Sequence, residues 1–230
     1  WTTPPTPRSI PRSEKVKKME NITIETLPQL FESVAQVMAD NAEHLCEMDA
    51  KMGDGDLGLT MRKGFAALPD ILRELDEPDL GRRLAKAGMK MSSVVPSTMG
   101  TLMGSGFLKA AKALKGKTEL APADFAAFVE AYYAGLQERG KANPGERTIL
   151  DALKPAADAV RAAVDGGEED VGVLACKAAE AAEAGKEATK EMEATHGKAV
   201  VHRAKLAGVP DQGAVVGALF YQAWKDVLAQ

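Results

Sequence analysis

The chain has 230 residues, a formal net charge of −4 and 45% hydrophobic residues. This length allows one large domain or two small ones, and the hydrophobic fraction is too high for a disordered protein. The negative net charge argues against a protein that wraps nucleic acid, and no apolar run approaches the roughly 18 residues of a membrane span. The two cysteines, Cys46 and Cys176, lie far apart without metal-binding spacing, so we expect neither a disulfide framework nor a zinc site, and a cytoplasmic location.

The first predicted segment, residues 1–18, differs in composition from the rest of the chain. It contains four of the twelve prolines and five Lys and Arg residues, without the apolar core of a secretory signal. Met19 resembles a natural start, so we interpret residues 1–18 as an added, disordered tail, with a processed leader as the alternative. The folded domain is predicted to comprise residues 19–230.

Helical periodicity runs through the remainder of the chain. Between residues 27 and 48, apolar side chains recur every three or four positions, as on one face of an amphipathic helix. Further helices are predicted between glycine or proline clusters, over residues 61–75, 79–95, 102–114, 122–139, 148–164, 170–193 and 211–228. No alternating segment is long enough for a strand. Together with 39 alanines and only 5% aromatic residues, this pattern predicts one all-α domain of about eight mostly antiparallel helices.

The most informative motif is a glycine-rich loop with three aspartates, residues 49–58. Asp49, Asp54 and Asp56 lie among glycines there, directly after an apolar helix. Glycine lets the chain curl so that several carboxylates face one point, and such a cluster is unfavourable without a counter-cation. Carboxylate oxygens favour Mg²⁺ or Ca²⁺ over zinc, and the spacing does not fit an EF-hand, so Mg²⁺ with phosphate oxygens is the preferred interpretation. The alternative is a turn whose aspartates cap the next helix.

A second loop, residues 92–106, combines small and hydroxyl side chains at a predicted helix start. Ser97 and Thr98 lie in this loop, and the free N–H groups of a helix start suit an anion. The alternative is an ordinary corner between two helices with hydroxyl caps. Two later loops place Thr148 and Asp211 at predicted helix starts, where both are also ordinary capping residues.

The aspartate loop strongly resembles that of the nucleotide-binding L subunit of dihydroxyacetone kinases. The resemblance is carried by Gly53-Asp54-Gly55-Asp56-Leu57-Gly58-Leu59-Thr60-Met61, with Asp49 upstream and Lys63-Gly64-Phe65 downstream, and it extends from about residue 22 to residue 228. It implies a barrel of eight antiparallel helices with the nucleotide at one end. It also implies that Asp49, Asp54 and Asp56 hold two Mg²⁺ ions, which bridge the phosphates of ADP or ATP.

The same resemblance implies the residues around the nucleotide. They are Leu57, Thr60, Ser97, Thr98, Met99, Gly100, Gly140, Ile149, Lys198, Asp211 and Gly213. This chain departs from the family pattern at several positions. Pro96 and Ser97 replace glycines, Met99 replaces a hydroxyl residue, and Gln212 replaces a proline. Lys198 replaces an arginine, which keeps the positive charge but loses the bidentate fork.

The resemblance implies a Mg²⁺- and nucleotide-binding subunit that transfers a phosphoryl group to dihydroxyacetone or another small ketose. Positioning and charge neutralisation suffice for such a transfer, so no catalytic nucleophile is expected. None of the three histidines is predicted to be catalytic. The phosphoryl source is ATP, or an M-type protein of a phosphoenolpyruvate-dependent phosphotransferase system that rephosphorylates bound ADP.

The ketose site is expected on a separate K-type subunit, because this chain has no second domain that could recognise a small carbonyl substrate. The chain alone is therefore predicted to be an inactive kinase subunit, with no nucleic-acid or membrane partner. Its own association into a homodimer is allowed but not predicted. The altered phosphate loop leaves one alternative, a non-catalytic nucleotide-binding module that docks to a regulator. A purely structural helical bundle would leave the charge cost of the aspartate loop unexplained.

Overall fold

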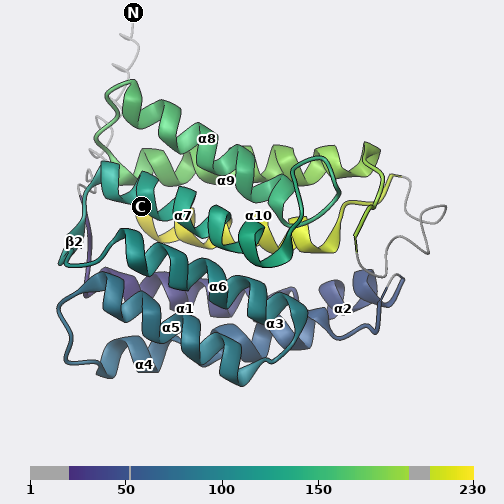
Figure 1. The fold of residues 1–230 in the computed structure, drawn as a ribbon, viewed down its shortest axis with the longest axis horizontal. Coiled ribbons are helices and arrows are strands. Elements are labelled where there is room, and N and C mark those ends of the chain that lie inside the picture. Colours follow the sequence, from purple (N-terminus) through teal and green to yellow (C-terminus); the bar gives the residue numbers. More distant parts are fainter. Residues whose placement is uncertain (1–20, 52, 197–207) are drawn as a thin grey trace, which may run out of the picture.

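The computed structural model describes residues 21–51, 53–196 and 208–230 (Figure 1), so the predicted tail, residues 1–18, and Lys198 lie outside the described residues. The α-helices of the described part are α1 (Thr26–Asp40), α2 (Ala42–Ala50), α3 (Leu57–Ala66), α4 (Pro69–Glu74), α5 (Leu80–Val94), α6 (Thr98–Ala113), α7 (Pro122–Gly140), α8 (Leu150–Asp165), α9 (Val171–Ala188) and α10 (Gln212–Leu228). A 3-10 helix, η1 (Thr189–Glu191), follows α9, and two short strands, β1 (Ile22–Thr23) and β2 (Glu119–Leu120), pair in antiparallel orientation.

The helices form a closed ring through their packing contacts (Figure 1). Neighbours around the ring are α1 and α10, α10 and α9, α9 and α8, α8 and α7, α7 and α6, α6 and α5, α5 and α3, and finally α3 and α1. Helix α1 closes the ring by its contacts with α10 and α3. Helix α2 lies at the right-hand end of the molecule in Figure 1. This architecture confirms the predicted all-α domain. None of the described helices is both long and apolar enough to cross a bilayer.

Aromatic side chains fill the centre of the ring. Four of the fully buried ones form a chain of ring contacts, from Phe107 to Tyr132, Phe220 and Trp224. The rings of Tyr132 and Phe220 stack at a centroid distance of 5.2 Å, an arrangement that is favourable beyond the burial of apolar area. Gly106 lets α6 approach this core, since a Cβ atom there would lie 2.7 Å from the Tyr132 ring. Small residues in the helices thus allow a few aromatic side chains to fill the core.

Two of the predicted helices are interrupted, and the one predicted over residues 170–193 ends as α9 at Ala188, where the 3-10 helix η1 follows. The predicted helix over residues 27–48 breaks at Asn41, whose backbone and side-chain nitrogens donate to the carbonyl oxygen of Val37 at 3.1 and 2.8 Å. Asn41 ends α1 because its side chain competes for a helical carbonyl, and the chain restarts as α2. The predicted helix over residues 61–75 begins earlier and is divided into α3 and α4 at Pro69, which has no N–H group to continue the hydrogen-bond ladder.

Four other helix starts, those of α5, α6, α9 and α10, follow their capping residues. Asp79, Asp170 and Asp211 accept hydrogen bonds from first-turn amides of α5, α9 and α10, at the predicted starts of these helices. Helix α6 begins at Thr98, ahead of its predicted start, because the hydroxyl of Ser97 caps it. The sequence does not predict the β1–β2 pairing, since two residues per strand are too few to show an alternating pattern.

Candidate metal and nucleotide site

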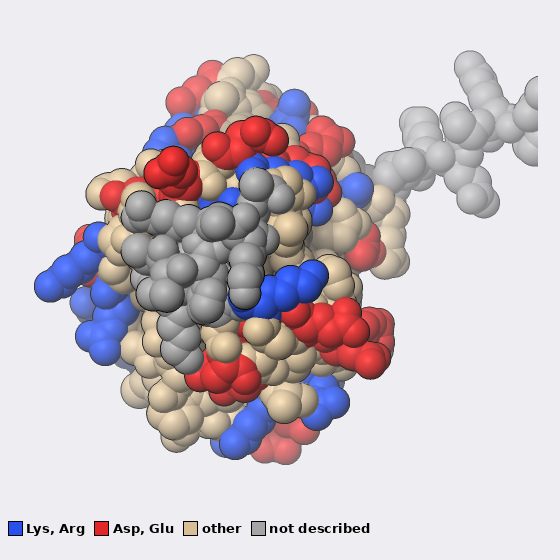
Figure 2. Space-filling model, turned by 90° about the vertical axis from the view of Figure 1, so that its right-hand side faces the viewer, with Lys and Arg blue, Asp and Glu red and all other residues tan. Residues whose placement is uncertain are grey.

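A cavity of about 1100 Å³ lies where several loops meet at one end of the helical ring. These loops connect α2 to α3, α5 to α6 and α7 to α8, and the segment that leads into α10 joins them. The cavity is lined by most of the predicted site residues: Asp49, Asp54, Asp56, Leu57, Thr60, Ser97, Thr98, Met99, Gly140, Ile149, Asp211 and Gly213. Figure 2 views this end of the molecule, where acidic and basic side chains both lie around the face, so neither sign of charge dominates it.

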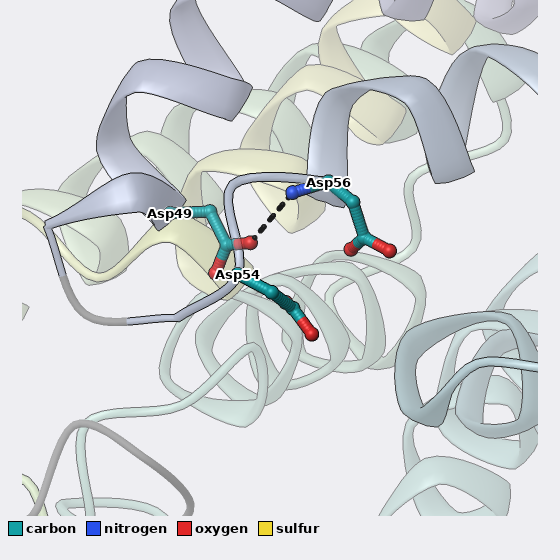
Figure 3. A group of neighbouring side chains, drawn as sticks. All are labelled: Asp49, Asp54 and Asp56. Atoms are coloured by element: carbon teal, nitrogen blue, oxygen red, sulfur yellow. Dashed lines mark hydrogen bonds between the residues drawn. The ribbon is translucent and has the colours of Figure 1, made fainter.

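Asp49, near the C-terminal end of α2, fixes the shape of the aspartate loop. It is 8% exposed, and its Oδ2 atom accepts hydrogen bonds from the backbone amides of Gly55 and Asp56 at 3.0 and 3.1 Å, the second of which is drawn in Figure 3. Gly55 has a φ of +76°, a left-handed conformation that favours glycine. The glycine therefore makes the turn that returns the backbone to the Asp49 carboxylate.

The three aspartates form a group that fits a hard cation. One oxygen of each carboxylate lies within 4.8 Å of the others, and Asp54 and Asp56 are exposed beside the buried Asp49 (Figure 3). Carboxylates this close repel one another, and a donor set made only of oxygen suits Mg²⁺. Asp56 occupies the N-cap position of α3, but its side chain makes no capping hydrogen bond. The alternative in which the aspartates serve as helix caps therefore fails for Asp56.

The start of α6 contributes Ser97, Thr98 and Met99 to the cavity wall. The Ser97 hydroxyl accepts a hydrogen bond from the Gly100 amide at 3.1 Å, so the cap occupies this amide. Gly100 is outside the cavity lining, and a Cβ atom there would lie 2.2 Å from the carbonyl oxygen of Val95. Gly100 thus allows tight packing behind the wall, and the other first-turn amides of α6 are the groups that suit an anion.

The α7–α8 loop brings Gly140 and Ile149 to the cavity. Asp151 holds this loop, because its carboxylate accepts hydrogen bonds from the amides of Gly145 and Thr148 at 2.5 and 2.7 Å. The N-cap residue of α8 is Ile149, which makes no side-chain capping hydrogen bond, and the Thr148 hydroxyl accepts a hydrogen bond from the Leu150 amide at 3.2 Å. Ile149 is 4% exposed, so it belongs to the core and also offers an apolar surface to the cavity.

Arg147 is a buried cation at the cavity and lies outside the predicted set of site residues. It is 4% exposed, and its Nη1 and Nη2 atoms donate to the carbonyl oxygens of Met192 and Val209 at 3.0 and 2.6 Å. Its place in a segment that resembles the family pattern, where it replaces a lysine, was an available signal, but no local pattern reveals its contacts with distant carbonyl groups.

Asp211 combines its predicted capping role with a place in the cavity wall. Its Oδ2 atom accepts a hydrogen bond from the Ala214 amide at 2.8 Å, which confirms it as the N-cap of α10. Burial raises the pKa of Asp211 to about 6, against the opposing effects of the Ala214 amide and the positive charge of Arg147. The carboxyl group of Asp211 therefore titrates closer to neutral pH than an ordinary aspartate.

The cavity wall also contains polar residues outside the predicted set, among them Arg139, His196 and Gln212. The Nε2 atom of Gln212 lies 3.4 Å from Oδ1 of Asp49 and donates a hydrogen bond to it. His196 Nε2 lies 2.5 Å from a carboxylate oxygen of Glu146 in the α7–α8 loop. For Gln212, its position directly after a capping aspartate was an available signal; for the other two, the sequence offers none.

Comparison with known proteins identifies the family of this chain. Residues 51–226 match the DAK2 domain. The chain belongs to the DAK2 domain family. This DAK2 domain is 36% identical over 200 residues to human (Homo sapiens) triokinase/FMN cyclase, and the match covers 86% of this chain and 34% of that protein. It is 31% identical over 184 residues to the ADP-binding subunit of PEP-dependent dihydroxyacetone kinase 1 from Listeria innocua, covering 80% of this chain and 86% of that subunit.

A solved structure shares the fold of this DAK2 domain. The dihydroxyacetone kinase from C. freundii in complex with AMP-PNP and Mg²⁺ aligns with a TM-score of 0.66 and 27% sequence identity, over 98% of this chain and 39% of that chain. The DAK2 domain thus spans about a third of the length of the human relative and most of the Listeria subunit. These relatives agree with the family that the aspartate loop indicates.

Proposed function

We propose that this DAK2 domain binds ADP or ATP together with Mg²⁺ and acts as the phosphoryl-transfer subunit of a kinase for dihydroxyacetone or another short ketose. The observation that carries the proposal is the group formed by Asp49, Asp54 and Asp56 at the wall of a cavity of about 1100 Å³. Two relatives support it, because the Listeria protein is named an ADP-binding subunit and the C. freundii structure contains AMP-PNP and Mg²⁺.

The proposed roles of the residues follow from their chemistry. The three aspartates would hold two Mg²⁺ ions, and bound Mg²⁺ would neutralise phosphate charge during transfer. Thr98 and the first-turn amides of α6 would face the phosphates. Ile149 offers an apolar surface for the base beside Gly140. Phosphoryl transfer depends on positioning and charge, so the proposal assigns no protein nucleophile.

The proposal also concerns the acceptor sugar and the source of the phosphoryl group. A small ketose needs a closed site with well-placed polar partners, and we assign that site to a separate K-type subunit that docks over the cavity. The phosphoryl source would be ATP, or an M-type phosphotransferase-system protein acting on bound ADP; the name of the Listeria relative, a PEP-dependent kinase subunit, supports the second. The cytoplasm is the proposed location, and the proposal is compatible with either a monomer or a homodimer.

One observation favours a second candidate function, a nucleotide-binding module that docks to a regulator without catalysis. Met99 lines the cavity at the start of α6, at a position where the family pattern has a hydroxyl residue. A thioether is a weak hydrogen-bond acceptor and donates no hydrogen bond to a phosphate oxygen. A chain of this kind would bind nucleotide but would support little phosphoryl transfer.

Two measurements test the proposal. Calorimetric titration with ADP should show binding that requires Mg²⁺ and disappears with EDTA, and an absence of Mg²⁺-dependent binding would refute the site.

A steady-state assay with dihydroxyacetone should then show no turnover by the chain alone and clear turnover after addition of a K-type subunit with ATP or with the phosphotransferase proteins. Turnover by the chain alone would place the ketose site within these 230 residues. Nucleotide binding without turnover under any condition would favour the regulatory module.

A further inference from the structure

Arg147 has a backbone conformation that L-amino acids rarely adopt. Its φ is +58°, and Lys141 in the same loop is the one other non-glycine residue with a positive φ in the part of the chain that the structure describes. This conformation is unfavourable for a residue with a Cβ atom and persists only where the surrounding structure holds it. An arginine in such a conformation therefore points to a specific use of its side chain.

The side chain of Arg147 joins two segments that are distant from it in sequence. One terminal nitrogen donates to the carbonyl of Met192 at 3.0 Å and the other to the carbonyl of Val209 at 2.6 Å. The residue is 4% exposed, so these bonds are shielded from water, where charge-assisted hydrogen bonds are strong. Because the guanidinium presents its donors in a fixed planar fork, Arg147 sets the spacing of the two carbonyl groups.

Both the loop of Arg147 and the segment of Val209 continue directly into the cavity wall. Ile149 follows Arg147 in the wall, and Asp211 and Gly213 follow Val209. The two parts of the wall are tightly packed, because a Cβ atom at Gly213 would lie 3.1 Å from the backbone nitrogen of Ile149. A shift of either segment would therefore change the shape of the cavity on this side.

The aspartate loop has its own support. The carboxylate of Asp49 holds the amides of Gly55 and Asp56, and the flanking helices α2 and α3 contact each other. The hydrogen bonds of Arg147 to Met192 and Val209 act on the other side of the cavity. One hydrogen bond, from Gln212 to Asp49 at 3.4 Å, links the segment that leads into α10 to the aspartate loop. Loss of the Arg147 contacts should therefore perturb the side of Ile149 and Gly213 more than the side of the aspartate loop.

We propose that Arg147 is a positioning residue for the nucleoside part of the bound nucleotide. Its fork holds the α7–α8 loop against the segment that leads into α10, and Ile149 and Gly213 thereby keep the spacing that a nucleoside requires. The phosphates and the cation bind on the side of the aspartate loop, which has its own support from Asp49, and therefore depend much less on Arg147. This inference rests on the proposed nucleotide-binding function.

The test compares two ligands across four proteins. ADP and inorganic pyrophosphate, each with Mg²⁺, are titrated calorimetrically into the wild-type chain and the variants R147M, R147K and K141M. R147M keeps an apolar stem without donors, and R147K keeps a charged donor group. K141M removes a cation from the same loop, at a residue that is also left-handed but has an exposed side chain, and so it is the matched control.

We expect R147M to bind ADP at least about tenfold more weakly, R147K to recover only part of the affinity because an ammonium group lacks the planar fork, and K141M to bind ADP like the wild type. Pyrophosphate should bind equally well to all four proteins, a pattern that a general folding defect would not produce. Unchanged ADP binding by R147M would overturn the inference. So would an equal loss of both ligands or a loss of cooperative unfolding, because Arg147 would then serve folding as a whole. A wild-type chain that binds no ADP would instead refute the proposed function, and this inference with it.

Discussion

The Oδ2 atom of Asp49 accepts a hydrogen bond from the backbone nitrogen of Asp56 at 3.1 Å (Figure 3), so one candidate metal ligand holds the backbone of another in place. The Gly55 amide donates to the same oxygen at 3.0 Å. Asp49 therefore organises the loop even before a cation binds, whereas Asp54 and Asp56 present exposed carboxylates.

This difference predicts that D49A destabilises the ligand-free chain whereas D54N does not. D49A leaves two backbone amides without their acceptor, so we expect its free energy of unfolding to fall by about 1–3 kcal/mol. D54N removes a charge from a repulsive group and should leave the stability equal or slightly higher. Urea denaturation in EDTA measures both values. Equal destabilisation by both substitutions would contradict the division of roles.

The second prediction concerns cation affinity. D54N and D56N each replace a charged oxygen ligand by a neutral amide, and each should weaken Mg²⁺-dependent ADP binding at least about tenfold. The matched control is E47Q, which removes a negative charge from an exposed position on α2. Calorimetry at fixed Mg²⁺ concentration provides the comparison. If E47Q weakens binding as much as D54N does, the effect is one of general charge and the metal assignment fails.

The third prediction is a coupling between ligand binding and thermal stability. A ligand that binds only the folded state at about 100 times its Kd stabilises that state by about 2.7 kcal/mol, which raises the Tm of a chain of this size by about 5–10 °C. We expect this increase with Mg²⁺ and ADP together, and a smaller one with either alone. Excess EDTA should reverse it. A Tm that responds to ADP equally with and without Mg²⁺ would speak against joint binding.

The fourth prediction is a pH dependence that arises from Asp211. Burial raises its pKa from 3.8 to about 6, so the folded chain binds this proton more tightly than the unfolded chain. The stabilisation from Asp211 is therefore present below about pH 4 and is lost as the pH rises through 6. D211N keeps a capping acceptor but does not titrate.

The measured quantity is the difference in unfolding free energy between D211N and the wild type, from urea denaturation at several pH values. It should change in favour of D211N by up to about 3 kcal/mol between pH 4 and pH 7. The other carboxylates are common to both proteins and cancel in the difference. A difference that is constant across this range would show that Asp211 titrates normally.

The sequence predicts those features that depend on residues close together in the chain. Asp79 and Asp211 are recognisable as caps because a capping side chain and its amide are three residues apart. The aspartate loop is recognisable for the same reason. The break at Asn41 is not, because Leu45 and Met48 continue the apolar spacing beyond it and are buried like the residues before it.

The features that escape prediction depend on contacts between distant residues. Gln212 donates to Asp49 across most of the chain, and Arg147 reaches the carbonyl of Val209. The local pattern places Gln212 directly after a capping aspartate, but for neither residue does it show which distant group the side chain contacts. Such pairs are set by the closure of the ring, which brings together loops that no periodicity relates.

The closure of the ring also fixes when a newly synthesised chain can complete its fold. Helix α10 packs against α1, where the Ser33 hydroxyl donates to the carbonyl of Ala223 at 2.9 Å and Phe31 contacts Trp224. Asp211 and Gly213, at the start of α10, also belong to the cavity wall. A nascent chain that still lacks α10 therefore exposes apolar surface and has an incomplete site, and folding has to wait for the contacts between α1 and α10. Synthesis of α10 is consequently the step that makes both the core and the binding site complete.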